Sequence, residues 1–166
     1  MCMDIQMKIV FACYKFSPSK ISGLIGWWTH SLYSHVAICV SGDDGIGAVY
    51  EAIDTGFVKA KTLGENHDAG TFVDMFEYSE KYPVDTAAVI AELESMVGMR
   101  YDFEGIASFV TGNRIPPNPC AVQCSNAAQR ASIAGGVPLQ NLAAHNMMPA
   151  HVAMSLALEF KQTIKI

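Results

Sequence analysis

Segments typical of strands fill the first half of this chain and segments typical of helices fill the second half, and this order constrains the fold most. Short runs of apolar, β-branched and aromatic residues alternate with turn clusters throughout the first half. These runs are residues 7–14, 34–40, 48–53, 57–63 and 71–78. Because short turns separate them, we expect antiparallel strands that form a meander.

Apolar residues at helical spacing predict helices in the second half. They cover residues 84–98, 103–110, 124–134 and 149–160. One earlier helix is predicted at 19–29, after the N-cap and first-turn proline of Ser17-Pro18. Strands grouped before helices are typical of an α+β domain rather than of a parallel βαβ sheet. A length of 166 residues fits one domain over residues 1–166.

The charge and the cysteines exclude several classes of function. A formal charge of −5 argues against a nucleic-acid partner, which usually requires a basic face. No apolar run is long enough to span a membrane, and the N-terminus lacks the pattern of a secretory signal. Five cysteines without framework spacing indicate reduced thiols in the cytoplasm, while association with a phage particle and the oligomeric state stay open.

Cys124 lies where the proline-rich segment 112–119 gives way to the predicted helix 124–134. The first N–H groups of a helix lack partners within the helix, and the positive end of the helix dipole lies there. Such a setting favours thiolate over thiol and lowers a cysteine pKa below its usual value of ~8.5. The same N–H groups can hold an oxyanion. Cys124 is the candidate nucleophile; the simpler interpretation is a small buried apolar residue.

A thiolate nucleophile gains from a histidine base, and five histidines compete for this role. His35 begins a predicted strand directly after a turn, so its ring can reach from the rim of the sheet to a neighbouring helix end. His145 and His151 would have to reach back to the start of the helix before them, and His30 complements the dipole of its own helix. His67 lies in a polar loop, where we expect it to be solvated. His35 is therefore the candidate base.

Glu51 interrupts the otherwise apolar run 48–53, on the strand expected next to that of His35. Half-buried strand positions disfavour Glu, so this carboxylate needs either a solvent-facing position or a partner such as an imidazole N–H. The residues alone leave both interpretations open.

Four pieces of the sequence, in their order, resemble the circularly permuted NlpC/P60 family of papain-like cysteine hydrolases. They are residues 25–40 (IGWWTHSLYSHVAICV), Tyr50-Glu51-Ala52, residues 98–103 (GMRYDF) and Gln123-Cys124-Ser125. Papain-like enzymes of ordinary order place the cysteine helix before the histidine strand. Permuted members, among them YiiX-like proteins, phage proteins and, more distantly, lecithin retinol acyltransferase, reverse that order, as this chain does.

The resemblance implies a permuted papain-like fold, an antiparallel sheet or partial barrel packed against helices, with the catalytic cysteine at the N-terminus of a late helix. It implies Cys124 as nucleophile, His35 as general base and Glu51 as the residue that orients the imidazole, with no cofactor. The implied reaction is hydrolysis of an amide bond through an acyl-enzyme, in a peptide or acyl-amide such as a peptidoglycan fragment. Lipid acyl transfer or thioester hydrolysis on the same fold stays open, as does a non-enzymatic structural or binding module of a phage or bacterium.

Tyr101, Ser125 and Trp28 are expected to line the substrate pocket. For Trp28 the alternative is a core position, and for the Tyr101-Asp102 pair it is a helix cap by the aspartate. No metal site is expected, because Cys120 and Cys124 lack a second ligand pair at zinc-finger spacing.

Two features bear on the substrate. A lipid substrate requires a larger exposed apolar surface around the active site. The Trp27-Trp28 and Met147-Met148 pairs are the candidates to form it. Many permuted members carry Glu where this chain has Asn126, a difference that concerns the substrate more than the mechanism.

Overall fold

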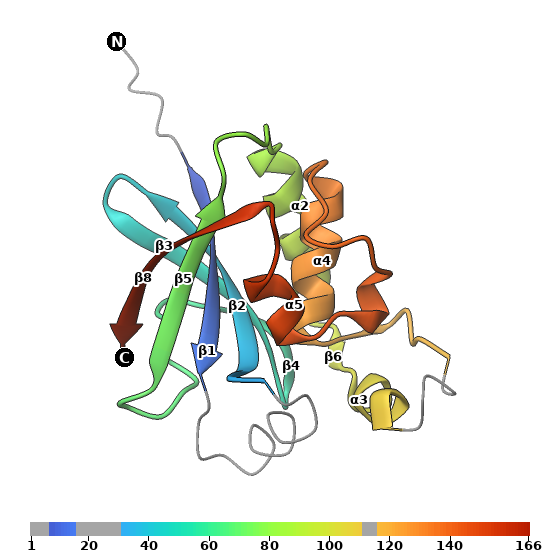
Figure 1. The fold of residues 1–166 in the computed structure, drawn as a ribbon. Helices are drawn as coiled ribbons and strands as arrows, with labels where there is room; N and C mark the ends of the chain where they lie inside the picture. The colour runs from blue at the N-terminus through green and yellow to red at the C-terminus, as the bar shows by residue number, and fades with distance from the viewer. Residues whose placement is uncertain (1–6, 16–30, 111–115) are drawn as a thin grey trace.

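A six-stranded antiparallel sheet carries helices on one of its faces, which makes the fold a mixed α+β structure (Figure 1). The computed structural model describes residues 7–15, 31–110 and 116–166. The strands lie in the order β4-β3-β2-β1-β5-β8. Their bounds are β1 (Lys8–Lys15), β2 (Tyr33–Gly42), β3 (Gly45–Ile53), β4 (Gly56–Ala60), β5 (Phe72–Tyr78) and β8 (Leu158–Lys165). The predicted helix at 19–29 lies outside the described residues.

The first four strands form the expected meander, because each pairs with the next along the chain. The fifth predicted strand leaves this pattern: β5 pairs with β1 rather than with β4. The segment 61–71 therefore has to cross the sheet from the edge strand β4 to the far side of β1. This crossing brings its residues over the strands that carry the candidate site.

Four helices of the described part accompany the sheet, namely α2 (Thr86–Met96), α3 (Phe103–Val110), α4 (Cys124–Ala134) and α5 (Pro149–Ala153), together with the 3-10 helix η1 (Ala144–Asn146). Asp85 caps α2 by accepting a hydrogen bond from the backbone N–H of Ala88 at 3.0 Å. A small parallel sheet joins β6 (Arg100–Tyr101) to β7 (Ala121–Val122), directly before α4. Among the described helices, none combines the length and apolar composition that a bilayer crossing needs.

The prediction of a last helix at 149–160 is correct for residues 149–153 and wrong for the rest. The helix α5 ends at Ala153, and the chain then turns into β8, which pairs with β5 along residues 72–78. Alanine, methionine and leucine in this segment favour a helix locally, but the hydrogen bonds that β5 offers at the sheet edge outweigh this propensity. Ser155 supports the turn, since its Oγ donates to the carbonyl oxygen of Leu139 at 2.7 Å.

Apolar side chains lie on both faces of the sheet, because successive residues of a strand point to opposite sides. On one face, Val36 and Ile38 of β2 belong to the main core beneath α2, α4 and α5. On the other face, Ala37 and Cys39 belong to a smaller cluster that Leu63, from the crossing segment, helps to cover. The alternation of β2 places His35 on this second face.

Candidate active site

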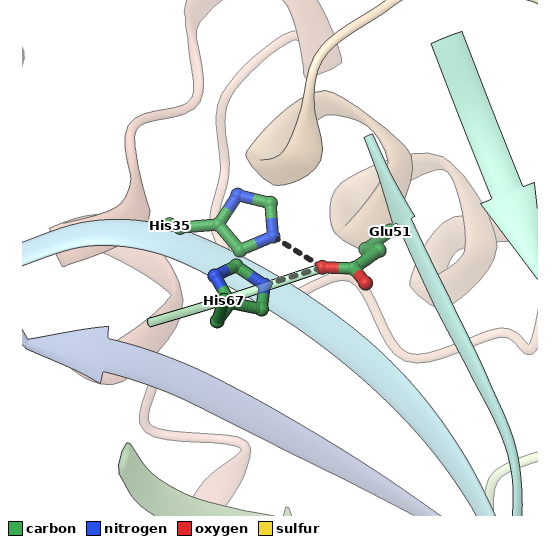
Figure 2. Close-up of side chains that lie close together, drawn as sticks. All are labelled: His35, Glu51 and His67. Atoms are coloured by element: carbon green, nitrogen blue, oxygen red, sulfur yellow. Dashed lines mark hydrogen bonds and ion pairs between the residues drawn. The ribbon is translucent and has the colours of Figure 1, made fainter. Parts of the chain in front are cut away.

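His35 and Glu51 lie on neighbouring strands, and their side chains meet. The register of β2 and β3 sets Glu51 opposite Ala37, two residues along the strand from His35 and on the same face. The Nε2 atom of His35 lies 3.0 Å from Oε2 of Glu51 (Figure 2). The partner that Glu51 needed on an apolar strand is therefore an imidazole, and the solvent-facing interpretation is wrong.

Glu51 is buried completely, with 0% of its side chain exposed. Three donors compensate: the Nε2 atoms of His35 and His67 on Oε2, at 3.0 and 2.7 Å, and Nδ2 of Asn66 on Oε1 at 2.8 Å. Burial alone would raise the pKa of Glu51, but these hydrogen bonds and the charge of His35 hold the pKa well below its ordinary value. Glu51 is thus an ionised carboxylate inside the protein.

The charge of Glu51 fixes the tautomer of its neighbours. A carboxylate only accepts hydrogen bonds, so the Nε2 atoms of His35 and His67 both carry the proton and donate. In neutral His35 the remaining nitrogen, Nδ1, then holds the lone pair. That nitrogen is the one free to take a proton from a thiol.

Cys124 is the first residue of α4, as predicted, and its side chain interacts with His35. The residue before it, Gln123, makes no side-chain cap, so the first N–H groups of the helix are not taken by a cap at this position. Burial alone would raise the pKa of Cys124. The charge and hydrogen bond of His35, joined by the backbone N–H groups of Val36 and Ser125, outweigh burial and lower the pKa.

The contact with Cys124 raises the pKa of His35, whereas it lowers that of the thiol. Burial opposes a charge on the ring, but the charge of Cys124 and the hydrogen bonds with Cys124 and Glu51 raise the pKa of His35 to about 10. A lowered thiol pKa next to a raised imidazole pKa favours a thiolate–imidazolium pair over two neutral groups. The described residues thus bring Cys124, His35 and Glu51 together as a relay from sulfur to imidazole to carboxylate.

His67 belongs to this cluster, and the expectation that it is solvated is wrong. Only 13% of its side chain is exposed, and its ring stacks on Tyr14 with centroids 4.1 Å apart. A lone histidine in a polar loop carries no periodicity that would place it, so the sequence pattern could not identify it. The available signal was indirect: a carboxylate buried on an apolar strand needs several donors, and the loop 65–68 is rich in polar residues.

Of the three residues predicted to line the substrate pocket, only Tyr101 is described near the thiol. Tyr101 is half-buried near the thiol, since burial and then the charge of Cys124 raise its pKa. Asp102 caps α3 by accepting a hydrogen bond from the N–H of Gly105 at 2.8 Å. The Ser125 side chain is fully buried and donates to the carbonyl oxygen of Met147 at 2.8 Å, so it holds α4 rather than a pocket. Trp28 lies outside the described residues.

Buried polar atoms without a hydrogen-bond partner lie beside Cys124 in the sequence. Among the described residues, Nε2 of Gln123 and Oδ1 of Asn126 are buried and make no hydrogen bond. A buried donor without a partner lowers the stability of the fold, so its presence in a folded protein calls for an explanation such as a functional role. Gln123 therefore offers a free N–H donor next to Cys124.

Two further thiols and one methionine are buried away from solvent. Cys13 and Cys39 are fully buried, and burial raises the pKa of both thiols, that of Cys39 to about 12. Met147 is also fully buried, so this member of the Met147-Met148 pair supplies no exposed apolar rim.

The histidines of the cluster and Glu51 also offer three atoms of the kinds that bind metal ions, an arrangement that the sequence pattern did not point to. One ligand atom each from His35, Glu51 and His67 lies within 4.8 Å of the other two. Neighbouring ligands around tetrahedral zinc, each ~2.1 Å from the ion, are about 3.4 Å apart. The nitrogen–oxygen distances of 3.0 and 2.7 Å are hydrogen-bond lengths instead. Hydrogen bonds account for this geometry without an ion.

The chain has no match among the models of known protein families, and no curated protein matches it.

Proposed function

We propose that this protein is a cysteine hydrolase in which Cys124 is the nucleophile, His35 the general base and Glu51 the residue that orients the imidazole. The observation that carries the proposal is the contact between Cys124 and His35, with the buried Glu51 carboxylate on the far side of the ring. A thiol at a helix start, a histidine beside it and a third polar group behind the histidine are the parts that nucleophilic acyl transfer needs.

The proposed reaction starts with the proton of Cys124 on Nδ1 of His35. The thiolate attacks the carbonyl carbon of an amide, a C–S bond forms, and the carbonyl oxygen becomes an oxyanion. The backbone N–H of Ser125 and the free side-chain N–H of Gln123 are available to hold that oxyanion. As the C–N bond breaks, His35 gives its proton to the leaving amine.

Water completes the cycle. His35, neutral again, takes a proton from a water molecule as the water oxygen attacks the thioester carbon. The second tetrahedral intermediate breaks its C–S bond, releases the carboxylic acid and restores the thiolate beside the imidazolium. Throughout, Glu51 keeps Nε2 of His35 protonated, so that Nδ1 remains the nitrogen that exchanges protons.

For the substrate we propose an amide in a cell-wall peptide, on the strength of the resemblance to permuted NlpC/P60 hydrolases and to their permuted papain-like fold. Lipid acyl transfer is the second candidate, but the burial of Met147 removes part of the apolar rim that would favour it. A non-enzymatic module would have no use for a lowered pKa at Cys124.

The test is to incubate the protein with peptidoglycan fragments, with N-acyl amides and with short acyl esters, and to follow product and covalent adducts by mass spectrometry. Cys124→Ala, which removes the sulfur, is the control for each substrate. Amide cleavage with a transient acyl adduct on Cys124 supports the proposal. Turnover of esters alone favours the second candidate, and no adduct with any substrate contradicts both.

A further inference from the structure

The Glu51 carboxylate is shared by two histidines, and the second of them has no part in the proposed reaction. His67 Nε2 lies 2.7 Å from the same Oε2 atom that receives Nε2 of His35 at 3.0 Å (Figure 2). The two imidazole centroids are 5.0 Å apart. His67 therefore has the shorter contact with the one oxygen atom that sets the orientation of the proposed base.

Asn66, next to His67 in the chain, occupies the other carboxylate oxygen. Its Nδ2 donates to Oε1 of Glu51 at 2.8 Å. A carboxylate held only by His35 could rotate about its last side-chain bond, because this torsion has broad minima. Donors on both oxygens fix the carboxylate plane. Two adjacent residues of one crossing segment thus clamp the group that orients His35.

The clamp is itself fixed to the sheet. Tyr14 of β1 stacks on the His67 ring at 4.1 Å with an interplanar angle of 29°, and it also meets the His35 ring edge at 5.2 Å. The Tyr14 hydroxyl donates to the carbonyl oxygen of Leu63 at 2.9 Å, which ties the same crossing segment to β1. A continuous set of contacts thus leads from Leu63 to Cys124.

We propose that His67 is a positioning residue for the proposed hydrolase, which acts by donating its Nε2 proton to Glu51 and so holding the carboxylate that orients His35. This inference rests on the proposed function only in taking Cys124 and His35 as the reacting pair. The proposed role belongs to one group, the Nε2–H of His67 that donates to Glu51, and not to the packing of the imidazole ring. Partners that orient metal-ligating histidines contribute about 10–100-fold to affinity or activity, and we expect an effect of this order here.

Three substitutions separate donation from packing. His67→Gln keeps an N–H donor at nearly the distance of Nε2, His67→Met keeps a similar length without a donor, and His67→Ala removes both. His145→Met, on η1, is the matched control for the loss of a histidine. For each variant, the rate of Cys124 alkylation by iodoacetamide is measured from pH 5 to 10, with adducts assigned by mass spectrometry and folding checked by circular dichroism.

If His67 donates to Glu51, the alkylation rate at pH 6 falls about 10-fold or more in His67→Met and His67→Ala and stays within about 3-fold of wild type in His67→Gln. A structural role predicts instead that Gln and Met behave alike, which overturns the inference. An ordinary thiol profile in the wild-type protein contradicts the proposed function itself, so the two failures are distinguishable.

A second measurement needs no variant. In protein labelled with ¹⁵N-histidine, nuclear magnetic resonance reports which ring nitrogen carries the proton. The inference requires Nε2 of His67 to be protonated at pH 7. An unprotonated Nε2 at this residue contradicts it even where His67→Met fails to fold.

Discussion

The Glu51 carboxylate lies 3.0 Å from Nε2 of His35 on the next strand, and none of its side chain reaches solvent. Orientation of the imidazole is thus set from inside the protein, by a charge that water cannot screen. A buried charge of this kind requires its partners to stay in place.

Cys124 is expected to react faster than the other thiols at low pH. Because His35 and the N–H groups of Val36 and Ser125 lower its pKa, Cys124 should hold a larger thiolate fraction than an ordinary thiol at the same pH. Alkylation rates measured thiol by thiol should show this, and His35→Ala should remove most of the difference, since only the backbone N–H groups of Val36 and Ser125 then oppose the effect of burial on the thiol. Equal rates for all accessible cysteines would contradict the ion pair.

Glu51→Gln is expected to reduce both stability and turnover. The substitution removes the charge and replaces one carboxylate oxygen by an NH2 group, which must face donors, either Asn66 or the two histidines, so about 2–4 kcal/mol of unfolding free energy should be lost. Because the orientation of His35 is lost as well, turnover should fall by about 100-fold or more. Urea denaturation measures the first effect. A variant as stable as wild type would show that the carboxylate charge is not needed.

The pH dependence of stability should report Glu51 separately. The pKa of Glu51 is lower in the folded protein than its ordinary value of 4.5. Its contribution is therefore fully present above about pH 4.5 and is lost as the pH falls toward the folded value. Denaturation between pH 3 and 7 should show wild type losing stability in this range, and Glu51→Gln losing less. Parallel curves for the two proteins would count against the assignment.

Gln123→Ala tests the free donor beside the nucleophile. If the buried Nε2 of Gln123 holds the oxyanion, turnover should fall by about 10²–10³ while alkylation of Cys124 stays as in wild type, because alkylation forms no oxyanion. Asn126→Ala, another buried amide of the same segment, is the control. Equal small effects of both substitutions on turnover would remove Gln123 from the mechanism.

Ser125→Ala separates support of the helix from chemistry. The variant loses the hydrogen bond to Met147 and leaves a buried carbonyl oxygen without this donor, which should cost about 1–2 kcal/mol in thermal or urea unfolding. The pH profile of Cys124 alkylation should stay unchanged, because the backbone N–H of Ser125 remains. A shifted profile would mean that the hydroxyl acts on the thiol.

Local patterns in the sequence predicted much of the fold. The helix at 124–134 has the predicted bounds, and the strands around His35 and Glu51 lie where alternation and turn clusters placed them. These features depend on neighbours in sequence, which a single chain displays. They were enough to set His35 near the start of a strand and Cys124 at a helix start.

The features that the sequence did not reveal depend on long-range pairing. The strand β8 forms because β5 offers it an edge, against the helical preference of the segment that leads to it. His67 reaches Glu51 because β5 pairs with β1, which carries the intervening segment over the site. No local pattern encodes which strands become neighbours, so the second histidine of the cluster could not be predicted.

The distance in sequence between β2 and α4 has a consequence for when the thiol becomes reactive. Contacts between remote segments require a long loop to close, so they form late and slowly during folding. Until α4 docks beside β2, Cys124 has no imidazole next to it and remains an ordinary thiol. In the proposed hydrolase, a newly made or partly unfolded chain would therefore carry a less reactive Cys124, and the activated thiolate would form only when folding is complete.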